Sequence, residues 1–175
     1  MPKPQNARQD LRIESLGKAH EKASFSCGVP ALNRYLATQA SQDVAKRVAA
    51  CFVATPDGSI IAGFYTLSQY SIDLVELPHL IAAKLPKYPE VPATLLGRLA
   101  VNEVFRGQGV GEFLLLDALY RSLRQSKEIA SAAVVVDAKD ERAKGFYEHF
   151  EFLSLPGISH RLFLPMKAIE KLFSD

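Results

Sequence analysis

The sequence predicts a single α/β domain in which a mixed central sheet is flanked by helices. In the first half of the chain, two β-rich runs around a strong turn signal indicate an antiparallel hairpin. In the second half, two compact apolar runs are each followed by a segment of helical periodicity, as is typical of a sheet covered by helices. With 175 residues and 48% hydrophobic content, the chain fits one domain over residues 1–175, with a flexible polar leader expected over residues 1–10.

The predicted hairpin lies between residues 51 and 68. Its β-rich runs are Cys51–Ala54 and Ile60–Ser68, and the Pro-Asp-Gly sequence at 56–58 favours a tight turn between them. Ahead of the hairpin, Leu11–Leu16 fits a short strand. Val29–Val48 places its apolar side chains near one helical face and predicts a first helical segment.

A proline-rich stretch separates the hairpin from the next predicted strand. Prolines at positions 78, 86, 89 and 92 leave only Pro78–Leu85 free to form a short helix, with its proline in the first turn. The rest of Leu77–Pro92 is expected to be an irregular loop. Leu95–Val101 then predicts a strand that ends at a glycine-rich turn, and Gly109–Arg124 predicts a helix. The apolar residues at helical spacing in it are Phe113, Leu116, Tyr120 and Leu123.

The C-terminal part of the chain completes the alternation of strands and helices. Ala132–Val136 is largely β-branched and predicts a strand covered on both faces. Asp140–Phe150 shows the helical period again. Phe152–Leu155 and Arg161–Leu164 are expected to be closing strands, and Met166–Phe173 a terminal helix.

The composition argues against export, membrane insertion and a disulfide framework. The polar start has no apolar stretch of a signal peptide, and no run approaches the roughly eighteen apolar residues that cross a bilayer, so a cytoplasmic protein is expected. Cys27 and Cys51 are expected to be buried free thiols. Lys and Arg outnumber Asp and Glu by eight to four in the first fifty residues, which fits a polyanionic partner or a solvated helix face.

The segment Arg106-Gly107-Gln108-Gly109-Val110-Gly111 joins the predicted strand to the predicted helix. A helix N-terminus presents unpaired N–H groups and the positive end of the helix dipole, and glycines let a phosphate approach them. Arg106 is expected to add a charge-assisted hydrogen bond or to screen the phosphates. The glycine spacing differs from the dinucleotide fingerprint, and no Gly-Lys-Ser/Thr follows, which disfavours a dehydrogenase or a kinase. By itself the turn fits either a diphosphate site or a connection without a ligand.

In its context, the turn resembles the acyl-CoA pyrophosphate loop of GNAT acetyltransferases, where Arg-x-x-Gly-x-Gly follows a strand and opens a long helix. The stretches "FSCGVPALNRYLATQA", "GFYTLS", "LPKYPEVPATLLGRLAVNEVFRGQGVGEFLLLDAL" and "VVVDAKDERAKGFYEHFEF" together resemble the GNAT toxins of bacterial toxin–antitoxin pairs over nearly the whole chain. One position departs from the family: Glu151 replaces a glycine, so the turn after the preceding predicted helix is expected to be built differently.

The resemblance implies a fold and an activity. The fold is that of GNAT acyl-CoA N-acyltransferases, and the reaction is transfer of acetyl from acetyl-CoA to the α-amine of an aminoacyl-tRNA, which blocks translation. The implied protein partners are a small ribbon-helix-helix antitoxin and a second copy of the chain in a homodimer.

The resemblance also assigns the site residues. Main-chain groups of Leu99, Ala100 and Val101 are expected to bind the pantetheine arm as an added strand would. The implied pyrophosphate site consists of Arg106, Gly107, Gln108, Gly109, Val110 and Gly111. Tyr147 matches the family tyrosine that acts as general acid for the departing thiolate, although its periodicity alone fits a core tyrosine.

Acetyl transfer makes unequal demands on acid and base catalysis. An α-amine has a pKa of about 7.7 to 8, and esterification of its carboxylate lowers that value further, so a strong enzymic base is not required. Glu103 is a candidate for such a base, but its position beyond the predicted strand end, near the glycine turn, argues against that role. Asp137 and Asp140 bracket the start of the following helix, where an N-cap role is favoured over a catalytic one.

The remaining charged residues bear on the acceptor. The candidates for contacts with tRNA phosphates are Lys18, Lys22, Arg34, Lys46, Arg47, Lys84, Lys87 and Arg98. The four histidines show no paired metal-ligand spacing, so no metal is expected. Two other functions fit the same cofactor site: a GNAT enzyme for a small amine or a protein N-terminus, and a non-catalytic acyl-CoA-binding regulatory module. The basic N-terminal half favours tRNA over a polyamine.

Overall fold

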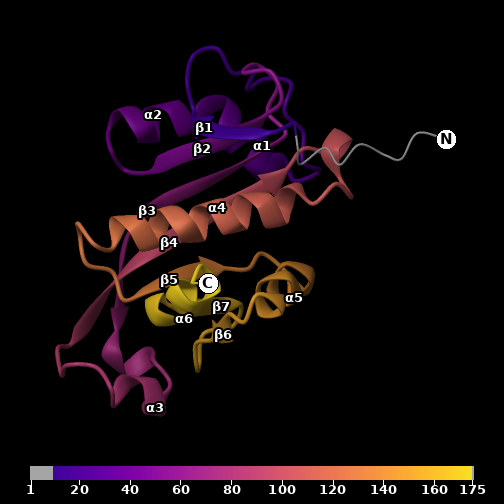
Figure 1. Ribbon diagram of the computed structural model, residues 1–175. Helices are drawn as coiled ribbons and strands as arrows, with labels where there is room; N and C mark the ends of the chain where they lie inside the picture. Colours follow the sequence, from indigo (N-terminus) through magenta and orange to yellow (C-terminus); the bar gives the residue numbers. More distant parts are fainter. Residues whose placement is uncertain (1–9, 175) are drawn as a thin grey trace. The chain divides into compact units, whose positions relative to one another are not determined.

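The computed structural model describes residues 10–174 (Figure 1). The predicted leader, apart from Asp10, therefore lies outside the described residues. Contacts divide the described chain into two compact units, one of residues 10–68 with Arg98–Ala118 and one of Gln69–Gly97 with residues 119–174. Within residues 10–174, no helix is long and apolar enough to span a membrane.

The described strands form one sheet in the order β1-β2-β3-β4-β5-β7-β6. Their bounds are β1 Arg12–Ser15, β2 Ala50–Thr55, β3 Gly63–Asp73, β4 Glu90–Val101, β5 Ala133–Asp137, β6 Leu153–Ser154 and β7 Arg161–Pro165. β4 and β5 run parallel, whereas β2 is antiparallel to β1 and β3, and β7 is antiparallel to β5 and β6. The predicted α/β class with a mixed sheet is confirmed.

The helices alternate with these strands along the chain. They are α1 Pro30–Thr38, α2 Ala40–Ala45, α3 His79–Ala82, α4 Val110–Gln125, α5 Glu141–His149 and α6 Met166–Leu172, with single 3-10 turns at η2 Leu74–Glu76 and η3 Glu103–Phe105. The short helix after Pro78 and the terminal helix lie where the sequence predicts them.

In the first unit, β2 and β3 form the predicted hairpin, and Asp57 shapes its turn. The Asp57 Oδ1 accepts hydrogen bonds from the N–H groups of Ser59 (2.8 Å) and Ile60 (2.9 Å), which hold the pKa of this carboxyl below its usual value. Gly58 has a φ of +85°, a conformation that glycine adopts without strain. Because these bonds extend the turn to Ile60, β3 begins only at Gly63.

The helical segment predicted over Val29–Val48 is two helices, because the chain breaks at Gln39. The Tyr35 hydroxyl donates to Asp43 Oδ2 at 2.8 Å, and the Gln39 side-chain amide donates to Asp43 Oδ1 at 2.9 Å. These bonds connect α1 to α2 across the break and stabilise it.

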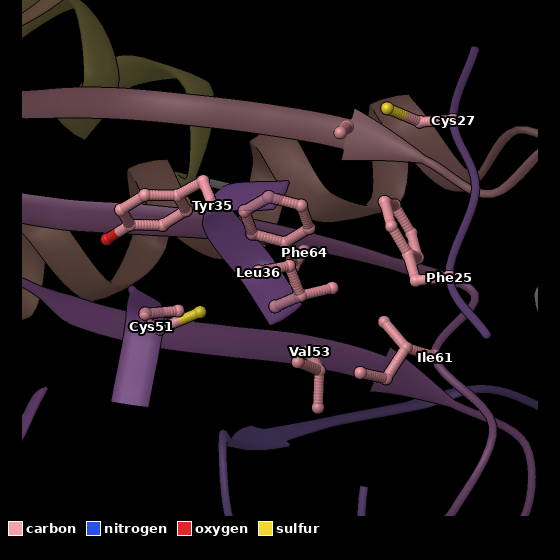
Figure 2. Packing of buried hydrophobic residues seen from close by; sticks show 10 residues of the cluster. Phe25, Cys27, Tyr35, Leu36, Cys51, Val53, Ile61 and Phe64 are labelled. Atoms are coloured by element: carbon pink, nitrogen blue, oxygen red, sulfur yellow. The ribbon is translucent and has the colours of Figure 1, made fainter. Parts of the chain in front are cut away.

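Figure 2 shows the core of the first unit, in which α1 packs with β2 and β3. The ring of Tyr35 stacks with Phe64 at 6.3 Å between centroids, and Phe25 meets Phe64 edge-on at 5.4 Å. Cys27 and Cys51 are buried and free, as predicted, and burial raises the pKa of the Cys51 thiol to about 12. At neutral pH this thiol is protonated, so it serves as an apolar core side chain.

The second unit is built around β5, which pairs with β7, and β7 in turn pairs with β6; Figure 1 shows these strands with α5 and α6. Residues 133–136 are buried, which confirms the prediction of a strand covered on both faces. The prediction of an irregular loop is wrong for residues 90–92, because β4 begins at Glu90 rather than at Leu95. The strand tolerates Pro92 because this residue precedes the β5 register, and its carbonyl accepts a hydrogen bond from the Ala132 N–H at 2.8 Å.

Helix α4 lies where the sequence predicts it, but its buried face is a different one. The buried residues are Val110, Leu114, Leu115, Ala118, Leu119 and Ser122. Tyr120, which the helical spacing placed on the apolar face, is exposed. Phe113 and Leu116 are half-buried. The Leu-rich sequence of this helix offers two apolar stripes, and periodicity alone does not show which of them is buried.

Candidate functional site

The end of β4 is fixed against β3 in the first unit. A Cβ on Gly63 would lie 2.8 Å from the Ala100 carbonyl oxygen and 2.7 Å from Leu114 Cδ1, so only glycine permits this approach. Directly after the strand, the buried Asn102 donates hydrogen bonds from its main chain and its side chain to two carbonyls of the β2–β3 connection, at 2.8 and 3.0 Å. The main chain of Leu99–Val101 is thereby held in extended form.

The same strand has a stretch beyond its pairing with β5. The parallel register covers Thr94–Leu96, opposite Val134–Val136, whereas β4 continues to Val101. Main-chain groups beyond such a register are those that an added, strand-like ligand uses.

A sharp turn follows and leads into the 16-residue helix α4. Gly107 and Gly109 both have a φ of +75°, in the left-handed region that favours glycine. A Cβ added to Gly107 would meet no atom within 4 Å, so this side of the turn is open. Two left-handed residues turn successive amides toward one side, and α4 contributes the positive end of its dipole. The turn therefore fits a diphosphate.

Arg106 is engaged by the protein itself. Its Nη2 donates to the Cys27 carbonyl oxygen at 3.0 Å and lies 3.6 Å from a carboxylate oxygen of Glu103. The Glu103 carboxylate also accepts from the Ser26 hydroxyl at 3.3 Å. The Arg106 guanidinium and the carboxylate of Glu103, just before the turn, are thus both bound to the segment ahead of α1.

In the second unit, Tyr147 lies on α5 with its ring buried against Phe146 and Phe152, at centroid distances of 5.2 and 5.4 Å. Within residues 10–174 its hydroxyl has no hydrogen-bond partner. Burial raises the pKa of Tyr147 above the ordinary phenol value, so the hydroxyl keeps its proton at neutral pH. Such a group has a proton to donate, and no acceptor for it lies among the residues that the structure describes.

The two aspartates before Tyr147 differ in role. The Asp140 carboxylate accepts from the Ala143 N–H at 2.8 Å and caps α5, as predicted. Asp137 instead pairs with Arg161, whose Nε donates to Asp137 Oδ1 at 2.7 Å. In the part of the chain that the structure describes, no three His, Cys, Asp or Glu side chains are grouped as a metal site.

Comparison with known families identifies the fold that carries these features. Residues 47–153 match the acetyltransferase (GNAT) domain. The chain belongs to the GNAT acetyltransferase family. Among curated GNAT relatives, a tRNA-acetylating toxin of Mycobacterium tuberculosis (strain ATCC 25618 / H37Rv) is 34% identical over 160 residues, covering 91% of this chain and 95% of the relative.

Two solved structures extend the comparison. AtaT complexed with acetyl-methionyl-tRNAfMet has a TM-score of 0.86 and 31% identity, covering 94% of this chain and 100% of the other. A tyrosine-to-phenylalanine mutant of the AtaT toxin, bound to the C-terminus of the antitoxin AtaR and acetyl-CoA, has a TM-score of 0.81 and 27% identity, covering 95% and 99%.

The GNAT fold places Glu151 in a glycine-like conformation. Glu151 has a φ of +68°, and its N–H donates to the Glu148 carbonyl at 2.9 Å. The backbone here takes the left-handed form that suits a glycine, so Glu151 bears the strain of this conformation.

The basic residues predicted to contact tRNA differ in their surroundings. Exposed in the first unit are Lys18, Arg34, Lys46 and Arg47, and exposed in the second are Lys84 and Lys87. Lys22 is half-buried, with its Nζ 3.4 Å from the Gly17 carbonyl oxygen. The Arg98 guanidinium lies over the Tyr35 ring, 3.5 Å from its centroid, so this arginine also packs against an aromatic ring of the core.

Sequence reasoning missed the partners of Arg98 and Arg106. The bond from Arg106 to Cys27 joins residues 79 positions apart, beyond the reach of any local pattern. The available signal was Gly28 in the "FSCG" stretch, since an isolated glycine before a helix indicates a close approach or a positive φ.

Proposed function

We propose that this GNAT enzyme transfers acetyl from acetyl-CoA to the α-amine of an aminoacyl-tRNA and thereby blocks translation. The observation that carries the cofactor assignment is the turn before α4, with two left-handed glycines and an open side at Gly107. The observations that carry the acceptor are the 34% identity to a tRNA-acetylating toxin and the likeness to AtaT in complex with acetyl-methionyl-tRNAfMet.

The first unit would bind acetyl-CoA mainly through its backbone. The amides of the segment from Gly107 to Gly111 would hold the pyrophosphate, as their conformation and the dipole of α4 favour. The main chain of Leu99–Val101 would pair with the pantetheine arm. Acetyl-CoA supplies an activated acetyl group as a thioester, and these contacts would keep that group in one position.

Tyr147 would act as the general acid, with its hydroxyl returning a proton to the departing thiolate. An ordinary thiol has a pKa of about 8.5, so a thiolate leaves more readily when a positioned acid protonates it. The support is twofold: the hydroxyl of the buried Tyr147 keeps its proton, and a tyrosine-to-phenylalanine mutant of AtaT has been solved with acetyl-CoA bound.

The acceptor and the partners follow from the relatives. The exposed basic residues of each unit would contact the phosphates of the tRNA, and such contacts weaken as salt rises. An antitoxin would bind the protein, as AtaR binds AtaT, and we propose the ribbon-helix-helix type. We also propose a homodimer that acts in the cytoplasm, where charged tRNA is found.

The decisive experiment incubates the protein with labelled acetyl-CoA and total charged tRNA, with deacylated tRNA as the control. Label that co-purifies with charged tRNA and is released by ester hydrolysis as an acetyl-amino acid supports the proposal. Label found only on an added polyamine or a peptide N-terminus would instead identify a small-amine or protein acetyltransferase. Binding of acetyl-CoA without any transfer would identify a regulatory module. Growth arrest on expression, relieved by the antitoxin, would support the toxin role.

A further inference from the structure

A set of interactions links the turn before α4 to the segment that precedes α1. The Glu103 N–H donates to the Ser26 carbonyl oxygen at 2.8 Å, and the Ser26 hydroxyl donates to Glu103 Oε2 at 3.3 Å. Arg106 Nη2 donates to the Cys27 carbonyl oxygen at 3.0 Å and lies 3.6 Å from Glu103 Oε1. These four contacts, all within the first unit, are called the clasp below.

Gly28 is the residue that lets the clasp close. It has a φ of +84°, and a Cβ placed on it would lie 2.7 Å from Arg106 Nη2 and 3.0 Å from Glu103 Oε1. Real Cβ atoms essentially never come within 3.0 Å of a non-bonded atom, so a side chain here would push away the Arg106 guanidinium that the clasp requires. The backbone and the charged pair therefore fit each other only with glycine at this position.

The segment held by the clasp is itself anchored in the fold. The Cys27 N–H donates to the Asn33 side chain of α1 at 2.8 Å, and the Cys27 side chain is buried in the core. The clasp thus connects the turn to the start of α1 through a rigid element rather than through a loose loop.

The ion pair of the clasp contributes little to global stability, because both side chains are about half exposed. The clasp instead fixes the position of the chain from Glu103 to Arg106, directly before Gly107. A site built from main-chain amides depends on where its chain is held, since small displacements of a binding group reduce affinity.

We infer that Glu103 and Arg106 are positioning residues for the diphosphate site: by clasping Ser26–Gly28 they hold the glycine turn in its binding conformation. The role of Arg106 in cofactor affinity is then exerted through the Cys27 carbonyl. This inference rests on the proposed function, because it takes the turn to be the acetyl-CoA site.

Gly28→Ala tests the clasp, and the chain offers a matched control. Gly58 has a φ of +85°, and its Cβ would lie 2.7 Å from Arg12 Nη2, so Gly58→Ala introduces the same backbone strain and displaces an arginine in the same way, but on β1. Acetyl-CoA affinity of the full chain is measured by calorimetry, with circular dichroism to check folding. The clasp predicts binding about three- to tenfold weaker in Gly28→Ala, and within about twofold of wild type in Gly58→Ala.

A second variant covers the case in which Gly28→Ala fails to fold. Removing an exposed acid beside an anion site should tighten anion binding on electrostatic grounds alone. Glu103→Ala removes the two clasp contacts made by the carboxylate, so the inference predicts about three- to tenfold weaker acetyl-CoA binding in a normally folded protein. Tighter or unchanged binding in this variant overturns the clasp.

A double-mutant cycle completes the test. In the clasp, Gly28→Ala acts through Arg106, so Gly28→Ala combined with Arg106→Ala should bind acetyl-CoA within about twofold of Arg106→Ala alone. If Arg106 instead contacts the phosphates directly, Gly28→Ala alone stays within about twofold of wild type, and the inference is overturned. A wild-type protein that does not bind acetyl-CoA refutes the proposed function itself, which is a different result from a wild type that binds and variants that do not respond.

Discussion

Replacing Tyr147 by phenylalanine should separate the chemistry of this enzyme from its stability. The hydroxyl has no hydrogen-bond partner within residues 10–174, so its removal breaks no protein hydrogen bond. The ring contacts with Phe146 and Phe152 remain. The expected change in the free energy of unfolding is therefore small, about 0.5 kcal/mol or less.

The effect on turnover should be far larger. Loss of a general acid lowers a rate by about 10²- to 10⁴-fold, which corresponds to roughly 2.7 to 5.4 kcal/mol of transition-state stabilisation. Because burial raises the pKa of Tyr147, the wild-type acid stays protonated through neutral pH. The rise of the rate with pH should therefore follow the deprotonation of the substrate α-amine, with the same profile in wild type and variant.

The assay is single-turnover transfer of labelled acetyl to charged tRNA across a pH series, with acetyl-CoA affinity measured in parallel. Tyr120→Phe is the control, since this tyrosine is exposed on α4 and lies outside the proposed site. Unchanged affinity with a large loss of rate in Tyr147→Phe alone is the expected result. Full turnover would refute the general-acid role, and a loss of affinity equal to the loss of rate would show that the tyrosine binds rather than protonates.

Substitutions at three further positions test the structure around the site by urea unfolding. Glu151→Gly should stabilise the protein by about 0.5 to 1 kcal/mol, because it relieves a left-handed residue; a destabilised variant would show that the glutamate bears no strain. Asp140→Ala should lower the free energy of unfolding by about 1 kcal/mol, because it removes the cap on the Ala143 N–H. Asp140→Asn should keep most of that stability, since asparagine also caps helices, and equal losses in both variants would contradict the cap. Gly63→Ala should cost about 1 to 3 kcal/mol, because its Cβ meets a main-chain carbonyl that cannot rotate away; wild-type stability would show that β3 and β4 can separate without cost.

The sequence predicted well the features that depend on short-range pattern. Pro-Asp-Gly at 56–58 marks its turn because Asp57 accepts hydrogen bonds from neighbouring amides, and Asp140 caps a helix for the same local reason. The run Ala133–Val136 is buried on both faces, as its β-branched composition predicts.

The sequence predicted poorly what depends on distant partners. The start of β4 at Glu90 lies within a proline-rich stretch. Pro92 precedes the register with β5, and its carbonyl accepts a hydrogen bond from the Ala132 N–H, a contact that no local pattern indicates. The clasp brings together residues far apart in the chain, and no local rule indicates that Arg106 has a carbonyl of the protein as its partner. The left-handed φ of Glu151 was not predicted, because glutamate ordinarily avoids this conformation and only the geometry of the turn imposes it.

The division of the chain into two interleaved units has a consequence for its synthesis. The residues of the first unit are complete once Ala118 has been made, although Gln69–Gly97, which belongs to the second unit, is made between its two parts. The second unit must wait for β5, β7 and α6 near the end of the chain. On the ribosome, the half with the glycine turn can therefore assemble before the half with Tyr147 exists, and no single cut yields two fragments that each contain one whole unit.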